Sequence, residues 1–270
     1  MVTRKNGHDY KISDEFWTKI KPLLPFPKPK KKRGIPRKDD KRIMSGIFYL
    51  LRTGCQWKAL PRCYGAPSTV HDRFQEWQRS GLFEKMWQAG LLDYDEEGLE
   101  WEWQAIDGAM TKAPLGGAGT GANPTYRGKK GTKRSLLTDG KGIPLSVVVD
   151  GANRHDKMLL KGTLDAIIIE RPSHEVTQNI CMDKGYDFPD IRELVEEYGY
   201  SAHIRRRGEE NIRIDIPGYR ARRWVVERTH SWINRFRRLL IRWEKKIENC
   251  LAMLHFARAW ITFRAAGLFG

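Results

Sequence analysis

The sequence is poor in cysteine and contains no long apolar run. Its four cysteines stand far from one another, without the close pair that a structural zinc site usually needs. No stretch approaches the roughly 20 apolar residues of a membrane-spanning helix, and the basic N-terminus lacks the apolar segment of a secretory signal. The glycines of 116–121 have neither P-loop nor dinucleotide-binding spacing. We therefore expect a cytoplasmic or nucleoid-associated protein with ordinary thiols and no nucleotide site.

Acidic residues are heavily outnumbered by basic ones. The chain has 49 Lys and Arg residues against 33 Asp and Glu residues, a formal net charge of +16 and a pI near 9.8. Such a surface attracts polyanions, because each cation near a phosphate can release a condensed counterion. A membrane partner would call for an amphipathic basic helix or a lipidation motif, and we see neither. Nucleic acid is therefore the expected partner.

Residues 1–92 have the pattern of a helical domain. Ser13 precedes an acidic turn followed by apolar residues at helical spacing, which is typical of a capped helix. The same spacing recurs over Asp39–Arg52, and Gly54 is placed to end that helix. Ser68 can cap a further helix that runs to Arg79. The first third of the chain is thus expected to be all helix.

The helices of 1–92, with a tight glycine-containing connection, resemble a helix-turn-helix DNA-binding unit. In this interpretation residues 68–79 form the recognition helix, and Arg73 and Gln75 are candidates for contacts with bases. A plain helical bundle produces the same pattern. The Pro/Lys-rich segment 27–37 is either a solvated basic linker or an arm that follows DNA phosphates.

Residues 99–270 change to a mixed α/β pattern. Polar and apolar residues alternate over Leu99–Asp107, which predicts a half-buried strand that ends at Asp107. Two short strands flank Asp139-Gly140, a strong hairpin signal. The remaining expected elements are helices over 156–169, 189–198, 219–240 and 249–263 and strands over 179–183 and 200–204. Strands that first run together and then alternate with helices predict a mixed sheet.

Carboxylates at strand ends are the main candidates for chemistry. Asp107 and Asp183 each end a predicted strand, and parallel pairing would place both at one edge of the sheet. Phosphodiester chemistry uses paired divalent metals, and hard metals such as Mg²⁺ prefer carboxylate ligands. A third acid, Glu227, lies on a basic helix face together with Arg223. Each alone has an ordinary alternative, a turn residue for either Asp and an ion-pair partner for Glu227.

Several motifs in the same order closely resemble bacterial insertion-sequence transposases of the IS5 family, within the IS4-like group. The motifs are Ala105–Gly108, Gly128–Gly131, Gly151–Asp156, Asp183–Asp187 and Arg223–Thr229. The resemblance runs over essentially the whole chain. Two positions depart from the family's Tyr-Arg-Glu signature, since Tyr219 lies one residue farther from Arg223 than the pattern asks and Asn234 stands where a Lys is often found.

The resemblance implies an RNase H-like catalytic domain over 99–270 that follows the helical DNA-binding domain. It implies that Asp107, Asp183 and Glu227 form a DDE triad that holds two Mg²⁺ ions, for which Mn²⁺ can substitute. The expected reaction cleaves the ends of an insertion sequence and joins the 3′ ends to target DNA. Double-stranded DNA is then the partner, and pairing two ends calls for a homodimer or a higher oligomer.

Basic residues of the second domain are expected to hold DNA backbones rather than to read sequence. These candidates are Lys129, Lys130, Lys133, Arg134, Arg205, Arg206, Arg207, Arg223, Arg228 and Arg235. His155 and Asp156 are accessory candidates that either approach the metal site or cap a helix. Trp232 either stacks on a DNA base or, on its apolar stripe, is buried.

Two other classes of protein share part of this pattern. A helix-turn-helix regulator without catalysis would explain the charge and the N-terminal region, but it would leave the acids at strand ends unexplained. An RNase H-like nuclease would use the same metal site without joining a 3′ end to target DNA. Assays of cleavage and of strand transfer separate these classes from a transposase.

Overall fold

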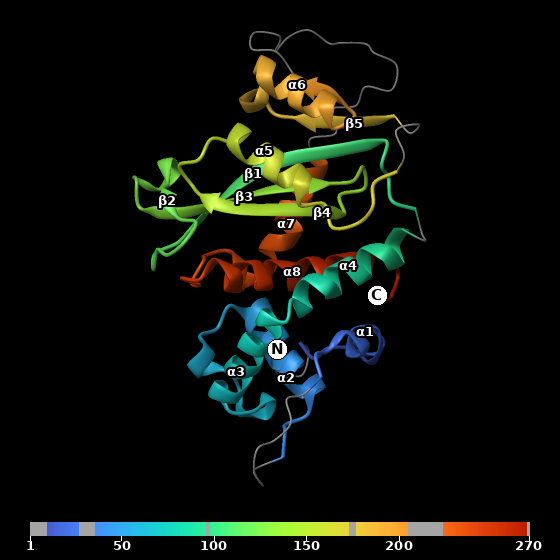
Figure 1. Cartoon of the computed structure of the whole chain (residues 1–270). Coiled ribbons are helices and arrows are strands. Elements are labelled where there is room, and N and C mark those ends of the chain that lie inside the picture. The colour runs from blue at the N-terminus through green and yellow to red at the C-terminus, as the bar shows by residue number, and fades with distance from the viewer. Residues whose placement is uncertain (1–9, 27–35, 96–97, 173–176, 205–223, 269–270) are drawn as a thin grey trace, which may run out of the picture.

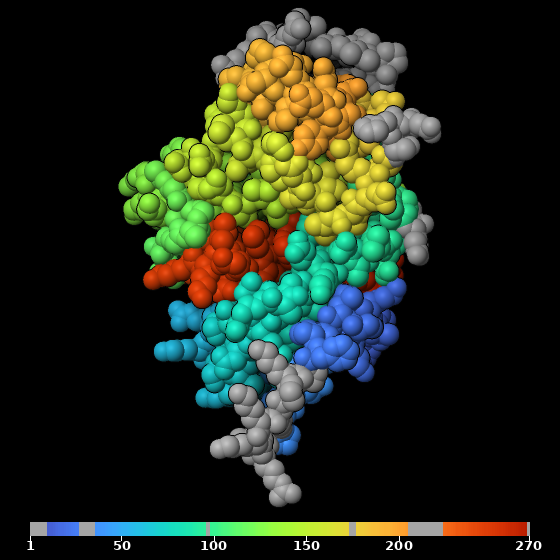
Figure 2. Space-filling model, viewed as in Figure 1, coloured from blue at the N-terminus to red at the C-terminus, as the bar shows by residue number. Residues whose placement is uncertain are grey.

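The computed structural model describes residues 10–26, 36–95, 98–172, 177–204 and 224–268. Figure 1 shows a stack in which the β-sheet lies on one side and the N-terminal helices on the other. Two long helices lie side by side between them, α4 (Leu82–Asp95) and α8 (Ile247–Ala265). The space-filling view has the same order from one end of the molecule to the other (Figure 2). The last helix of the described chain thus supports both the first helices and the sheet.

Three further helices form the N-terminal end of the stack. They are α1 (Asp14–Ile20), α2 (Asp40–Thr53) and α3 (Pro67–Arg79). Ser13 caps α1 by accepting a hydrogen bond from the backbone N–H of Phe16, and Gly54 ends α2 in the left-handed region at φ 72°, as predicted. The predicted cap of α3 was wrong. Ser68 lies inside α3, because Pro67 already occupies the first helical turn.

The sheet has six strands. They are β1 (Trp103–Lys112), β2 (Gly121–Ala122), β3 (Lys130–Thr138), β4 (Pro144–Gly151), β5 (Gln178–Met182) and β6 (Tyr200–Ile204). β3 pairs antiparallel with both β1 and β4, and short β2 extends β3. On the other side of β1, β5 and then β6 pair in parallel. The order β4-β3-β1-β5-β6, antiparallel and then parallel, is the RNase H-like mixed sheet.

β1 is longer than the sequence pattern indicates, and Asp107 lies in its middle rather than at its end. The two neighbours of β1 account for the difference. Parallel pairing with β5 stops at Ala105 opposite Cys181, whereas antiparallel pairing with β3 continues to Lys112 opposite Gly131. Hydrogen bonds to β3 therefore keep β1 extended beyond Ala105, where its pairing with β5 stops.

Three shorter helices pack against the sheet. They are α5 (Lys157–Asp165), which packs on β3 and β4, α6 (Pro189–Glu197), which packs on β6, and α7 (Trp224–Asn234), which packs on β1 and β3. The helix predicted over 219–240 ends earlier, at Asn234. Phe236 leaves the helical conformation at φ −87° and ψ 93°, and its ring is buried 6.4 Å from the ring of Phe48 in α2.

One hydrophobic core runs from α1 to α8 across the predicted boundary near residue 95. Phe256 of α8 contacts Phe83 of α4 and Phe48 of α2, with ring centroids 5.4 and 5.7 Å apart. The division into 1–92 and 99–270 therefore stays a prediction from sequence, while the packing joins the two parts. Among the described helices, none combines the length and hydropathy required to cross a membrane.

Candidate active site

Asp107 lies in β1, and Asp183 directly follows the neighbouring strand β5. Ala105 of β1 is the parallel partner of Cys181 in β5, and each acid comes two residues later along the chain. Asp183 directly follows β5 and accepts a hydrogen bond of 2.6 Å from the backbone N–H of Lys184. Both acids are half-buried. β1 and β5 are therefore paired in parallel as predicted, but the pairing ends at Ala105 and Cys181, two residues before the acids.

A buried tyrosine shows that a further acid is close. Tyr186 is 1% exposed, and burial is the main cause that raises the pKa of its phenol. The negative charges of Asp156, Asp107 and Asp183 raise that pKa further. The charges of three carboxylates thus act on one phenol. The sequence analysis gave no role to Tyr186, although it lies inside the motif that begins with Asp183.

Helix α7 brings Glu227 toward the same part of the sheet. One turn after Glu227, His230 is buried beside the backbone of Asp107. Burial, and then the charge of Arg134, lower the pKa of His230 to about 3, while the Asp107 backbone acts in the opposite direction. Glu227 itself is exposed at the surface of the helix. β1 is thus in contact both with β5, which precedes Asp183, and with α7, which carries Glu227.

The donor atoms of these acids suit a hard divalent cation, which prefers carboxylate oxygens. Asp107 and Asp183 supply such oxygens from adjacent strands. Within the described ranges, however, no three side chains of His, Cys, Asp or Glu are grouped closely enough to hold a metal ion. The carboxylates therefore have the donor atoms that such an ion requires, but the three acids are not close enough together to hold it.

Asp156 lies beside this site and forms an ion pair. Its Oδ2 is 2.9 Å from Nζ of Lys133, which also donates to the carbonyl oxygen of Arg154 at 2.8 Å. Asp156 is the N-cap residue of α5, but its side chain makes no capping hydrogen bond. The neighbouring His155 is exposed and lies edge-on to Phe188, with centroids 5.7 Å apart. Of the two accessory candidates, Asp156 is the one near the acids.

Several of the predicted DNA-contacting cations lie elsewhere than expected. Lys133 and Arg134 are 6% and 4% exposed, because β3 is a central strand, and Arg134 donates a 2.6 Å hydrogen bond to Asn234. Their prediction as surface contacts was wrong for this reason. Lys129 and Lys130 are exposed before or at the start of β3. Arg205, Arg206, Arg207 and Arg223 lie outside the described residues.

The two residues proposed to read bases are engaged within the protein. Arg73 is 7% exposed and forms ion pairs with Asp40 of α2 and Glu76 of its own helix. Gln75 donates a 3.1 Å hydrogen bond to Asn249 at the start of α8. Both side chains thus hold α3 in place rather than projecting from the molecule. The role predicted for them in base contacts requires exposed groups, and burial argues against it.

The exposed side of α7 carries cations among aromatic rings. The guanidinium of Arg228 lies 4.6 Å from the ring centroid of Trp224 and 4.8 Å from that of Trp232. Trp232 is half-buried, so the choice between stacking on a DNA base and burial stays a prediction. Arg235, just beyond the helix, is exposed. Arg228 is half-buried and donates from Nη2 to the carbonyl oxygen of Lys141, so Arg235 is the more exposed of these two cations.

Comparison with known proteins identifies two family models that together match most of the chain. The family described as "Transposase DDE domain" matches residues 103–261, and the one described as "Putative transposase of IS4/5 family" matches residues 12–87. Residues 103–261 contain Asp107, Asp183 and Glu227. The first match alone covers more than half of the sequence.

Curated relatives are insertion-sequence proteins. The chain is 36% identical over 154 residues to the "Putative transposase for insertion sequence element IS402" of Burkholderia cepacia, covering 54% of this chain and 71% of that protein. It is 32% identical over 120 residues to an uncharacterized 16.2 kDa protein of the same element, covering 42% of this chain and 80% of that protein.

A solved structure, the Mos1 mariner paired-end complex with Mn, aligns at a TM-score of 0.31 and 13% identity over 84% of this chain and 85% of that one. A TM-score this low supports no conclusion about the site. The family and curated matches place this chain among the DDE transposases, in the IS4/IS5 group, whose members use divalent metal ions to cut and join DNA.

Proposed function

We propose that Asp107, Asp183 and Glu227 are the catalytic and metal-binding triad of this transposase. The observation that carries the proposal is the parallel register of β1 and β5, in which Asp107 and Asp183 each come two residues after the last pair, Ala105 and Cys181. The packing of α7 on β1 supports the third member, because His230, one turn from Glu227, lies at the Asp107 backbone. The substrates are the two ends of its insertion sequence and a target duplex, in the bacterial cytoplasm.

The three carboxylates would hold two Mg²⁺ ions, replaceable by Mn²⁺, which supply neutralisation of charge on the attacking and leaving oxygens of a phosphodiester. The partial exposure of Asp107 and Asp183 leaves room for a DNA phosphate to approach. Cleavage frees a 3′ hydroxyl at the end of the element, and the same acids then serve its in-line attack on target DNA. Asp156 and Lys133 support the site from the side of α5.

DNA is held by cations of the catalytic region that lie at or near the protein surface. Lys129 and Lys130 lie at the start of β3, and Arg228 and Arg235 lie on or next to α7. These groups bind phosphates and therefore position the strands without reading sequence. The N-terminal helices 1–92 are assigned to recognition of the ends. Two copies of the chain act together, because two ends must be cut and joined to one target.

The triad is tested with Asp107→Asn, Asp183→Asn and Glu227→Gln in the full-length chain. Each should abolish cleavage of an end-bearing duplex in Mg²⁺ and Mn²⁺ while leaving the dissociation constant for that duplex, measured in EDTA, unchanged within a few-fold. Asp190→Asn is the matched control, because this exposed acid begins α6 near the site and should retain activity. Metal-dependent cleavage that persists in the triad variants would refute the assignment.

A labelled 3′ end separates the transposase from a nuclease of the same fold. The wild-type chain should transfer the labelled strand into a supercoiled plasmid. Cleavage without transfer would assign the same acids to a nuclease. Binding without cleavage in either metal would leave only a DNA-binding regulator.

A further inference from the structure

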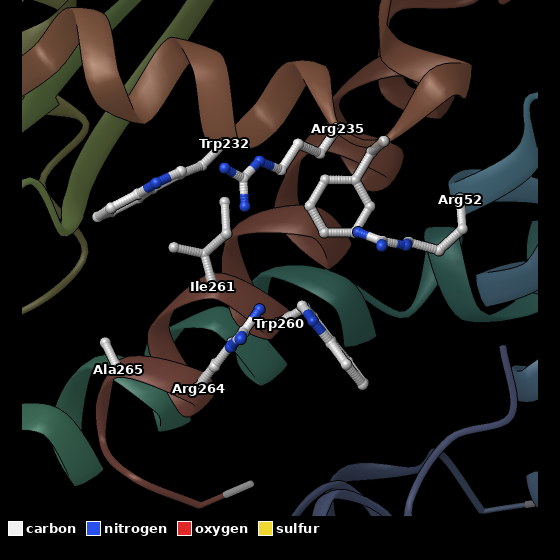
Figure 3. Close-up of a pocket in the computed structure, with 8 residues that line it drawn as sticks. Arg52, Trp232, Arg235, Trp260, Ile261, Arg264 and Ala265 are labelled. Atoms are coloured by element: carbon white, nitrogen blue, oxygen red, sulfur yellow. The ribbon is translucent and has the colours of Figure 1, made fainter. Parts of the chain in front are cut away.

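A cavity of about 370 Å³ opens where α2, α7 and α8 meet. Three arginines line it, Arg52 from α2, Arg235 from just beyond α7 and Arg264 from α8. Trp232 and Trp260 form aromatic walls. Figure 3 shows Arg235 and Arg264 extending from facing segments toward the space around Ile261, with the two tryptophans on either side. Among the described residues that line this cavity, none is acidic.

The three guanidinium groups are close enough to repel one another. Burial is the main cause that lowers the pKa of Arg52, and the charges of Arg235 and Arg264 lower it further. The Arg52 guanidinium rests 5.0 Å from the ring centroid of Phe236. In the part of the chain that the structure describes, none of the three forms an ion pair with a carboxylate within 4.0 Å. Three like charges thus converge on one cavity without a compensating anion.

Phosphate is the anion whose chemistry best fits these three guanidinium groups. A guanidinium presents a planar fork of N–H donors that matches phosphate oxygens, and an Arg cluster is a common phosphate site. The half-buried rings of Trp232 and Trp260 exclude water from the walls of the cavity, while Arg235 and Arg264 themselves are exposed. The volume lies in the range of small-ligand sites, roughly 300–1,000 Å³. It is therefore large enough for a phosphodiester with its sugar.

The cavity is also well placed for the DNA that enters the active site. The last residue of α7, Asn234, is about 10 Å from Glu227 along the helix axis, at 1.5 Å per residue. That length corresponds to about three base-pair steps of 3.4 Å in a duplex. A single DNA end can therefore reach both positions.

We propose that Arg52, Arg235 and Arg264 form a clamp for backbone phosphates of the DNA end, a few nucleotides from the reacting phosphodiester. The inference rests on the proposed function, because it assumes that the end lies along α7. The clamp links α2, in the N-terminal region, to α7 and α8. A phosphate held there fixes the DNA relative to both parts of the protein.

The test is the salt dependence of DNA binding, measured in EDTA so that no cleavage occurs. Each lost phosphate contact should lower the slope of log affinity against log salt concentration by about 0.9. The double variant Arg235→Gln/Arg264→Gln should therefore lose about 1.8 from the slope for an end-bearing duplex. Arg235→Lys/Arg264→Lys should retain most of it. Lys85→Gln is the control, because Lys85 is an exposed cation of α4 away from the cavity.

Both glutamine substitutions are at exposed positions, and an unchanged midpoint of thermal unfolding will confirm that the variant folds. A slope equal to that of the wild type would overturn the clamp. A change in sedimentation of the DNA-free protein, with an unchanged slope, would assign the cavity to acidic residues of a second copy and would also overturn it. Because the measurement needs no metal, cleavage that persists in the triad variants would refute the proposed function and leave the slope result intact.

Discussion

Asp156 lies against the backbone of Gly108, and a Cβ atom at position 108 would overlap its Oδ1 atom. Gly108 directly follows Asp107 on β1, so the absence of a side chain there allows α5 to bring a further carboxylate to the candidate site. The other oxygen of Asp156 is fixed by Lys133 at 2.9 Å. The glycine and the ion pair together determine where this carboxylate lies.

Gly108→Ala should therefore displace Asp156 from Lys133 and reduce DNA cleavage. We expect a loss of roughly tenfold in the rate, equivalent to about 1.4 kcal/mol in the barrier, with end binding in EDTA unchanged. Single-turnover cleavage at saturating protein measures it. Gly162→Ala in α5 is the control, because a Cβ atom added there would meet only a methyl group of Val148, at 3.9 Å. Full activity of Gly108→Ala would show that Asp156 has no part in the reaction.

Removal of divalent metal should separate the two activities of the chain. Cleavage and strand transfer need Mg²⁺ bound to the carboxylates of Asp107 and Asp183, whereas DNA binding by cationic side chains does not. EDTA should stop cleavage and strand transfer, while retention of an end-bearing duplex in a mobility-shift assay persists. Added Mg²⁺ or Mn²⁺ should restore both reactions. Cleavage that continues in EDTA would contradict a metal-dependent mechanism.

A buried carboxylate in the β3–β4 turn should make stability depend on pH. Asp139 accepts hydrogen bonds from the backbone N–H groups of Ile143, Lys141 and Glu100, at 2.7, 3.0 and 3.2 Å. Burial outweighs these bonds and raises the pKa of Asp139 to about 6, from 3.8. The folded protein therefore binds more protons than the unfolded chain between these values, so this contribution to stability is present below pH 3.8 and is lost as pH rises to 6.

The loss should be roughly 3 kcal/mol, from about 1.36 kcal/mol per pKa unit. Asp139→Asn removes the titration, so the difference in unfolding free energy between wild type and variant should shift by nearly this amount from pH 3 to pH 7, with about 2 kcal/mol of the shift between pH 4 and pH 6. Urea denaturation at a series of pH values measures it. A difference that is constant across this range would show that Asp139 titrates normally in the folded state.

The pair Arg238 and Glu244 should be costly to break. Both side chains are 7% exposed, and Nε and Nη2 of Arg238 each lie 2.8 Å from Oε1 of Glu244. Arg238 also donates to the carbonyl oxygen of Cys55, which joins the end of α7 to the N-terminal region. Glu244→Gln leaves a buried charge unpaired and should lower the unfolding free energy by about 3–5 kcal/mol.

The double variant Arg238→Met/Glu244→Leu should recover much of that loss, because it removes both buried charges. Asp165→Asn breaks the exposed pair with Lys161 and should barely change the denaturation midpoint. A Glu244→Gln midpoint equal to that of the wild type would show that water replaces the lost partner.

The residues that sequence reasoning located well are those whose neighbours along the chain determine their conformation. Ser13 and Gly54 bound helices through local hydrogen bonds and backbone geometry, and the Asp139-Gly140 hairpin also formed where expected. Asp183 follows a strand because a short apolar run ends there. Pairing of β1 with β5 then follows from general rules of parallel sheets.

The errors concern burial imposed by distant elements. Lys133 and Arg134 look like a surface patch in sequence, but β3 has strands on both sides and α5 and α7 packed against it, so all of β3 after Lys130 is buried. Arg73 is buried because α2 supplies Asp40 as its partner. Arg52, Arg235 and Arg264 share a cavity although they stand far apart in the sequence, and no spacing rule connects them.

The position of α8 between the sheet and the first helices has a consequence for biosynthesis. The ribosome produces α2 and α4 long before α8, yet Phe48 and Phe83 find their partner Phe256 only on that last long helix. The aromatic faces of the early helices therefore stay without their α8 partner while some 150 further residues are translated. This takes about 8–30 s at 5–20 residues per second. During this period the nascent chain exposes the kind of surface that chaperones bind.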